Sequence, residues 1–243
     1  MERTHETEPA VIEIVFFDAG ETILHPHPSF AELFASTCHR HGIEIKADDV
    51  KLAQERLAPH LLEIGDESGI ENPSLSAEAS YRFWTYLYRR LLQELNLDEK
   101  LAGELYRVFS DSRSYKLFDD VKPAFEKLEE LELRLGLISN FEGWLEKLLV
   151  ELEIGHVFDV SVISGVEGVE KPDPRIYELA LQKAGVDPQV SVHVGDSVRF
   201  DIDPARSAGM KVVLLDRVGR YEGATACPTI SSLEELPMLI SNF

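Results

Sequence analysis

The second half of this 243-residue chain alternates between short apolar segments and amphipathic segments. Short apolar segments bounded by turn residues are typical of buried strands, and apolar residues spaced three and four apart are typical of helices. The pattern predicts strands at 133–138, 160–163, 191–194 and 212–215, with helices at 122–131, 142–152, 172–184 and 202–208. Strands that alternate with helices in this way form right-handed βαβ units, so we expect a single parallel sheet.

One further strand is expected far from the others in the sequence. The run from Val11 to Phe17 is apolar and contains β-branched residues, as in a strand buried on both faces of a parallel sheet. Four helices are expected between this strand and the rest, at 29–41, 48–63, 76–95 and 98–115. The predicted α/β core therefore comprises residues 11–25 and 118–243, and an all-helical module is inserted at 26–117. Residues 1–10 are predicted to form a disordered tail.

The charge balance limits the possible partners. The chain has 24 Lys and Arg residues against 44 Asp and Glu residues, and a net charge of −20 repels nucleic acids and anionic membranes. There is no apolar run long enough to span a bilayer, and the N-terminal residues are acidic where a signal peptide would be basic. Cys38 and Cys227 form no disulfide framework and no metal-ligand spacing. We expect a cytoplasmic monomer or homodimer that binds neither nucleic acid nor membranes.

Polar residues stand where the expected strands end. Asp18 follows the first strand, Ser139 and Asn140 follow the second, and Asp196 follows the strand that ends at Val194. In open α/β sheets, ligands bind beyond the carboxyl ends of the strands. Each of these residues alone is a common turn or helix-cap residue, but together they predict a polar site at one edge of the sheet.

The chemistry of this site is suggested by its carboxylates. Asp18, Asp196 and Asp201 would raise one another's pKa if folding gathered them, unless a cation shared the site. Oxygen ligands without a nearby Cys or paired His favour a hard ion, and Mg²⁺ suits a site that also binds phosphate. The Lys171 ammonium and the Ser139 hydroxyl would then face the remaining oxygens of an anionic group, for which phosphate is the natural candidate.

Four segments in this order resemble the motifs of the haloacid-dehalogenase-like hydrolase superfamily. They are Val15–Thr22, Ile138–Asn140, Lys171–Tyr177, and His193–Ser197 together with Asp201. The resemblance spans almost the whole chain and implies a Rossmann-like core. The inserted helical module resembles the cap domain of the superfamily's first subgroup, which includes phosphoglycolate-phosphatase-like proteins.

The resemblance implies a phosphohydrolase that acts on a small phosphorylated metabolite. Asp18 would attack phosphorus to form an aspartyl-phosphate, which water then cleaves. Ser139 and Lys171 would hold the transferring phosphoryl group, with Thr22 and Asn140 as further substrate-binding residues.

The resemblance also implies how Mg²⁺ is bound. Asp18 and Asp196 would bind it through their carboxylates, and the main-chain carbonyl of Gly20 would be the third protein ligand. Asp201 would hold a supporting position near the metal and the lysine.

The chain departs from the superfamily at Gly20. Phosphatases of this superfamily carry a second aspartate at that position, which protonates the leaving group and later activates water. General acid–base catalysis contributes about 10²–10⁴-fold, so this chain should be slow on alkyl phosphates. Three replacements are open: Glu21, which is one residue too late; His25 or His27 in the segment that joins the core to the cap; and a proton from the substrate or from water.

Two other function classes remain open. A dehalogenase also lacks the second aspartate, and Tyr177 fits that pattern, but Asp196 would repel the carboxylate substrate of a dehalogenase. A non-enzymatic phosphate- or partner-binding protein would explain Gly20 and would bind Mg²⁺ and phosphate without turnover.

The sequence of the helical module indicates less about the substrate than the strand-end residues do. The helix from Tyr81 to Leu95 is rich in aromatic residues, which we expect to form the cap's own core. Arg89, Arg90, Arg107 and Arg113 could reach a second anionic group on a substrate, or could equally offset acids on a solvated face.

Overall fold

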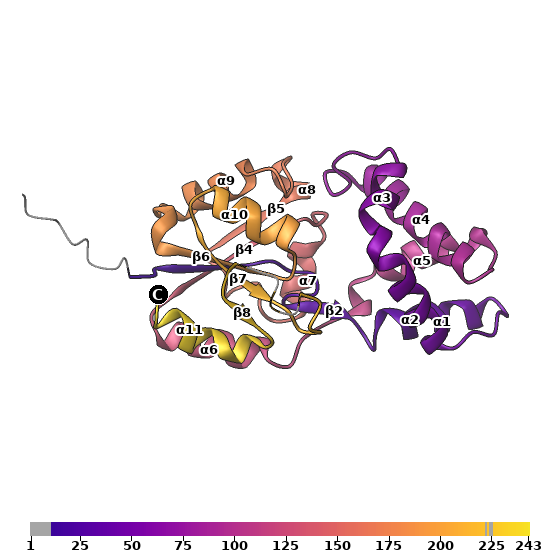
Figure 1. The fold of residues 1–243 in the computed structure, drawn as a ribbon, viewed down its shortest axis with the longest axis horizontal. Coiled ribbons are helices and arrows are strands. Elements are labelled where there is room, and N and C mark those ends of the chain that lie inside the picture. The colour runs from indigo at the N-terminus through magenta and orange to yellow at the C-terminus, as the bar shows by residue number, and fades with distance from the viewer. Residues whose placement is uncertain (1–10, 222, 224–225) are drawn as a thin grey trace, which may run out of the picture.

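The computed structural model describes residues 11–221, 223 and 226–243. Residues 1–10, the predicted tail, lie outside the described residues. A six-stranded parallel sheet is ordered β5-β4-β1-β6-β7-β8 (Figure 1). The strands are β1 Ile14–Phe17, β4 Arg134–Ser139, β5 Val160–Ile163, β6 Ser191–Gly195, β7 Lys211–Leu215 and β8 Thr229–Ile230. The predicted α/β fold with a parallel sheet is confirmed, and β8 was not expected.

β1 lies at the centre of the sheet, as its sequence predicts. Val15 and Phe17 pack into the core on one face, and Ile14 and Phe16 pack into the core on the other. All four side chains are fully buried because helices cover both faces of the sheet. Figure 1 shows α9 and α10 on one face and α6 and α11 on the other.

The helices of this lobe match the predicted ones in most places. They are α6 Val121–Glu130, α7 Leu145–Glu151, α8 Ser164–Glu167, α9 Arg175–Ala184, α10 Asp203–Ser207 and α11 Leu236–Ile240, with a π-helix at Val198–Ile202. The last predicted helix, 202–208, is thus preceded by one turn of π-helix, which is wider than an α-helical turn and carries Asp201. α8 and α11 were not expected.

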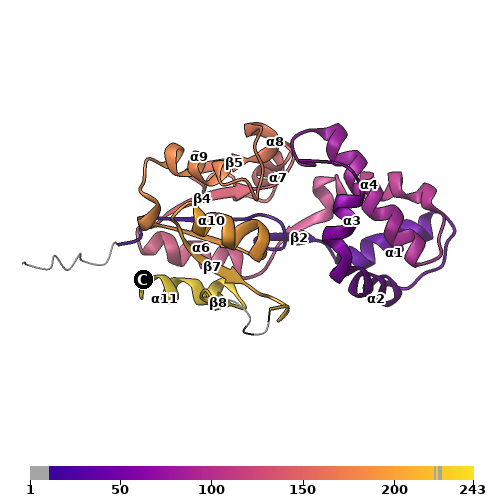
Figure 2. The ribbon, with the colours of Figure 1, turned by 45° about the horizontal axis from the view of Figure 1, so that its top comes forward.

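A second lobe is entirely helical and lies beyond one end of the sheet (Figures 1 and 2). It contains α1 Phe30–Arg40, α2 Ala47–Leu57, α3 Leu61–Glu67, α4 Ala77–Glu94 and α5 Ala102–Phe109. These helices bury their own apolar cluster, which includes Cys38, Tyr88 and Phe109. We call residues 30–109 the helical lobe. Among the described residues there is no helix with the length and apolarity needed to cross a membrane.

Two of the predicted helices in this lobe were too long. The predicted helix 48–63 is interrupted by a 3-10 turn at Ala58–His60, because Pro59 lacks the N–H that an α-helix requires. The predicted helix 98–115 ends at Phe109, and the chain then enters a strand.

Two short strands connect the lobes. β2 Leu24–Pro26 pairs antiparallel with β3 Tyr115–Leu117, so both connections cross side by side. Neither strand was expected, and they lie at the predicted boundaries near residues 25 and 117. The division into a core and a cap domain remains a prediction.

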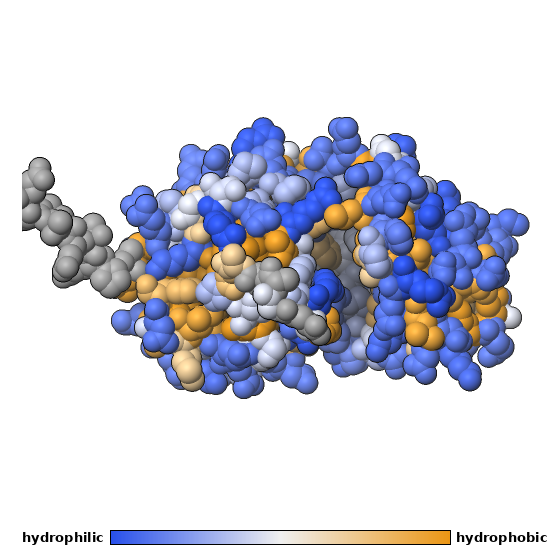
Figure 3. Space-filling view, in the orientation of Figure 1, coloured by the Kyte–Doolittle hydropathy of each residue, from blue (hydrophilic) through white to orange (hydrophobic). Residues whose placement is uncertain are grey.

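Side-chain contacts also join the two lobes. The backbone N–H of Ser74, from the loop before α4, donates to the Glu170 carboxylate over 2.8 Å, and the Ser74 hydroxyl donates to the same carboxylate. Ser80 on α4 donates to Glu142 over 2.6 Å. The surface between the lobes is hollowed (Figure 3). The helical lobe is therefore held over the carboxyl end of the sheet.

Candidate active site

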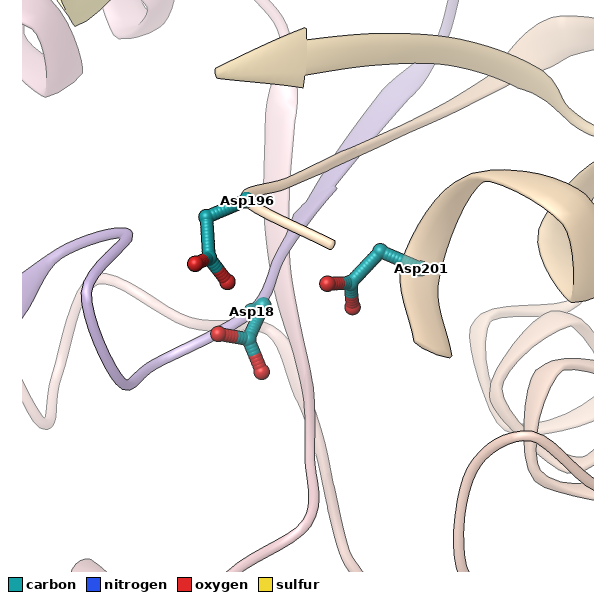
Figure 4. Close-up of side chains that lie close together, drawn as sticks. All are labelled: Asp18, Asp196 and Asp201. Atoms are coloured by element: carbon teal, nitrogen blue, oxygen red, sulfur yellow. The ribbon is translucent and has the colours of Figure 1, made fainter. Parts of the chain in front are cut away.

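Three carboxylates gather at the carboxyl end of the sheet (Figure 4). Phe17 pairs with Leu137 on one side and Val194 on the other, so Asp18 emerges between the ends of β4 and β6. Asp196 follows β6, and Asp201 comes from the π-helix. One oxygen from each of Asp18, Asp196 and Asp201 lies within 4.8 Å of the other two. The arrangement could hold a metal ion.

A buried lysine bridges two of these carboxylates. The Lys171 Nζ atom lies 2.5 Å from Asp18 Oδ1 and 2.6 Å from Asp201 Oδ1, and its side chain is 2% exposed. The Ser139 hydroxyl, at the end of β4, lies 3.4 Å from the same Asp18 oxygen. The structure thus brings together all of the predicted catalytic residues. Their roles in catalysis remain predictions.

The pKa values reflect this crowding. Burial alone would lower the pKa of Lys171, but the Asp18 and Asp201 carboxylates outweigh burial and hold its pKa above the usual value. Burial raises the pKa of Asp18 despite the opposing effect of Lys171. For Asp201, burial is outweighed by Lys171 and His193, which lower its pKa to about 2.

The carboxyl group of Asp196 is also strongly perturbed. Burial, followed by repulsion from Asp18 and Asp201, raises the pKa of Asp196 to about 8. Its side chain is 23% exposed, and no lysine reaches it among the ion pairs of the described residues. A cation at this position would offset the unfavourable charge of Asp196.

Asp201 is held in a supporting position. Besides Lys171, its carboxylate contacts His193 Nε2 at 3.1 Å and accepts from the Ser197 backbone N–H at 3.1 Å. A Cβ atom on Gly195 would lie 2.3 Å from the Asp201 Cγ atom, so only glycine lets this carboxylate pack against β6. The sequence analysis did not identify His193 as a contributor to the site.

Two predicted substrate-binding residues have other contacts. The Asn140 amide donates to the Lys171 carbonyl over 2.7 Å and accepts from the Lys171 N–H over 2.6 Å, so Asn140 fixes the backbone of the lysine. Thr22 is fully buried, and its hydroxyl has no hydrogen-bond partner among the described residues. Contact of Asn140 or Thr22 with a substrate remains a prediction.

At Gly20, where the superfamily carries its second aspartate, there is free space for a side chain. A Cβ atom on Gly20 would meet no atom within 4 Å, and the Gly20 backbone is not in the left-handed region. Glu21 next to it has a φ of 58° and an exposed side chain. The His25 ring lies 4.5 Å from the Phe118 ring and its Nδ1 contacts the Pro26 carbonyl. The three replacements for the acid remain predictions.

The fold and the site together define a Rossmann-like α/β protein with a lysine-bridged acidic centre at the strand ends. A protein-family model described as haloacid dehalogenase-like hydrolase matches residues 12–209. The chain belongs to this family of hydrolases.

Individual relatives agree with this assignment. A glyceraldehyde 3-phosphate phosphatase from Methanopyrus kandleri is 33% identical over 217 residues, which cover 87% of each chain. A phosphoserine phosphatase from Thermus thermophilus is 28% identical over 235 residues, or 90% of this chain and 94% of the relative. Among solved structures, the magnesium-bound HAD-hydrolase YfnB of Bacillus subtilis has a TM-score of 0.72 at 18% identity, covering 95% of this chain and 99% of that one.

Proposed function

We propose that the protein is a Mg²⁺-dependent phosphohydrolase of small phosphorylated metabolites, acting through an aspartyl-phosphate at Asp18. The observation that carries this proposal is the placement of Asp18 between Lys171 and Ser139 on one side and Asp196 on the other. The phosphatases of Methanopyrus kandleri and Thermus thermophilus among the relatives support the reaction class. Hydrolysis of phosphorylated metabolites, measured with Mg²⁺ and with a chelator, tests it.

The residues of the site fit Mg²⁺. The donor set consists only of oxygen atoms. The single positive charge of Lys171 cannot balance the three carboxylates, so a cation would offset the remaining negative charge. Asp18, Asp196 and the Gly20 carbonyl would hold the ion, while Lys171 and His193 keep Asp201 in support. When bound, Mg²⁺ supplies positive charge that offsets the charge of the transferring phosphoryl group.

The side chains then carry out the two steps. An Asp18 carboxylate oxygen bonds to phosphorus while the bond from phosphorus to the leaving oxygen breaks. Lys171 and Ser139 donate to the phosphoryl oxygens and hold them in line. Water attacks the phosphorus of the aspartyl-phosphate and releases Asp18 and phosphate.

We propose that water or the substrate supplies the proton that the leaving oxygen takes up, because Gly20 has no acidic side chain. The helical lobe acts as a cap that excludes bulk water.

Substituting Gly20→Asp is expected to raise activity on alkyl phosphates. The Gly20 backbone accepts a side chain without strain and the space beside its Cβ position is free, so we expect the new carboxyl to act on the leaving oxygen. We expect kcat/KM for an alkyl phosphate to rise by about 10²-fold and for p-nitrophenyl phosphate to change little, since nitrophenolate needs no proton. The matched control is Gly20→Asn, which has the same shape but no acidic proton. Equal alkyl phosphate activity in both variants and the wild type would contradict this account of Gly20.

Stability is expected to depend on Mg²⁺ more strongly at high pH. The pKa of Asp196 in the folded, metal-free protein is about 8, above its unfolded value, so ionising Asp196 destabilises that protein as pH rises toward 8. Mg²⁺ binds only the ionised carboxylate and removes this penalty. Thermal melting should show a larger Mg²⁺-induced rise in Tm at about pH 8 than at about pH 6. Asp201, with a pKa of about 2, does not titrate in this window.

The control for this experiment is Asp196→Asn, which should abolish most of the Mg²⁺-induced rise in Tm at both pH values. A rise in Tm that is the same or smaller at the higher pH would contradict the assignment of Asp196 as a metal ligand.

A further inference from the structure

Arg220 lies at the entrance to the site, on a core segment that the sequence analysis did not consider. The segment follows β7, whose carboxyl end lies beside that of β6. The Asp216 carboxylate accepts the backbone N–H groups of Arg220 and Tyr221, each over 2.8 Å, which fixes the turn. The Arg220 Nη1 atom then lies 3.7 Å from Asp196 Oδ2.

Arg220 is directed into a pocket at the edge of the acidic cluster. Glu21, Phe118, Asp196 and Arg220 all line this pocket, which we call the mouth. The Arg220 side chain is 59% exposed, and its only ion pair within the described part of the chain is the one to Asp196. Asp196 belongs both to the acidic cluster with Asp18 and to the lining of the mouth, so the mouth adjoins the place proposed for the phosphoryl group.

Arg217, the other arginine that lines the mouth, already has hydrogen-bond partners. Arg217 donates to the Asp120 carboxylate with both terminal nitrogens, at 2.8 and 2.9 Å, and to the Thr22 carbonyl at 2.8 Å. Its guanidinium also lies 3.9 Å from the centre of the Phe118 ring. Arg217 therefore holds the wall of the mouth and has little freedom to bind a substrate.

Three arginines in or next to the helical lobe are paired with nearby acids. Arg90 donates to Glu67 at 2.8 Å, Arg107 to Glu104 at 2.6 Å, and Arg113 to Asp111 at 2.5 Å. None of these three lines the mouth. Arg220 is therefore the better candidate for binding a second anionic group of a substrate.

We propose that Arg220 selects phosphomonoesters whose leaving alcohol carries a carboxylate, by binding that carboxylate at the mouth. The guanidinium matches a carboxylate through two parallel hydrogen bonds. Once Asp196 shares its charge with a cation, Arg220 has no other ion-pair partner within the described part of the chain. The Glu21 carboxylate, which also lines the mouth, disfavours a more highly charged group such as a second phosphate. This inference rests on the proposed phosphohydrolase function and names its substrate class.

The test compares two phosphomonoesters of nearly the same size, phosphoglycolate and ethyl phosphate, which differ by the carboxylate. Each is used as a competitive inhibitor of p-nitrophenyl phosphate hydrolysis by the full-length protein with Mg²⁺. We expect the wild type to bind phosphoglycolate about tenfold more tightly than ethyl phosphate, because a hydrogen-bonded charge pair is lost in the second. In Arg220→Gln, the ratio of the two inhibition constants should fall to within about twofold.

Arg206→Gln is the matched control, because Arg206 also forms an ion pair at 3.7 Å, with Asp203 on the same helix α10, and does not line the mouth. It should keep the wild-type ratio. If Arg220→Gln weakens both inhibitors by the same factor, or leaves the ratio unchanged, the inference is overturned while the proposed function stands. If the wild type with Mg²⁺ does not hydrolyse p-nitrophenyl phosphate at all, the proposed function fails, and the inference fails with it.

Discussion

Asp18→Asn is expected to remove phosphomonoester hydrolysis, lowering kcat by roughly 10⁴-fold or more, as losses of a catalytic nucleophile do. The amide keeps the shape of the carboxyl but cannot form the aspartyl-phosphate. Among the described residues, the two neighbouring carboxylates are engaged elsewhere, since Asp201 is bound by Lys171 and His193 and Asp196 is the proposed metal ligand. Initial rates with p-nitrophenyl phosphate at saturating Mg²⁺ measure the loss.

Asp173→Asn is the control for this prediction. Asp173 is an acid near Lys171 in sequence, but its carboxylate is paired with Arg175 outside the site. It should keep near-wild-type activity. Hydrolysis by Asp18→Asn within about tenfold of the wild type, in a variant that melts normally, would show that Asp18 is not the nucleophile.

Lys171→Met is expected to destabilise the protein as well as inactivate it. The methionine fills a similar volume but leaves Asp18 and Asp201 buried without their cation. Removing one partner of a buried ion pair costs about 3–5 kcal/mol, which for a chain of this size lowers Tm by roughly 6–20 °C. Thermal melting in the presence of a chelator measures this effect without a contribution from Mg²⁺.

A double variant separates the charge effect from loss of packing. Lys171→Met combined with Asp201→Asn removes one of the two uncompensated carboxylates, and it should recover part of the lost stability without recovering activity. If the single variant melts within about 2 °C of the wild type, Lys171 does not neutralise the buried acids in solution.

Much of the core could be predicted from the sequence because local patterns determine it. A four-residue strand such as β1 is apolar on both faces, and this pattern is typical of a parallel sheet whose two faces are covered by helices. The convergence of Asp18, Ser139 and Asp196 follows from the same topology, since adjacent parallel strands end at the same edge. The convergence of these residues could therefore be predicted from local sequence patterns alone.

The elements that were missed are short or depend on contacts distant in sequence. β2, β3 and β8 have two or three residues each, too few to show a periodicity. The pairing of Asn140 with the Lys171 backbone depends on side-chain geometry that no spacing encodes.

Arg220 could have been found from the sequence. It follows the strand after β6, so the rule that drew attention to Asp18 and Asp196 applies to it as well. The replacement of the second aspartate by Gly20, in contrast, was evident from the sequence alone. The structure adds that the position has room for the missing acid.

The most direct test of the account is to look for the phosphoryl group on Asp18. The protein is mixed with a phosphomonoester and Mg²⁺, quenched in acid within the first turnover, and digested for peptide mass spectrometry. We expect the peptide that contains Asp18 to gain the mass of one phosphoryl group, and to gain nothing when a chelator replaces Mg²⁺ or when Asp18 is asparagine. Turnover without a phosphorylated peptide, or with the phosphoryl group on another residue, would contradict the account.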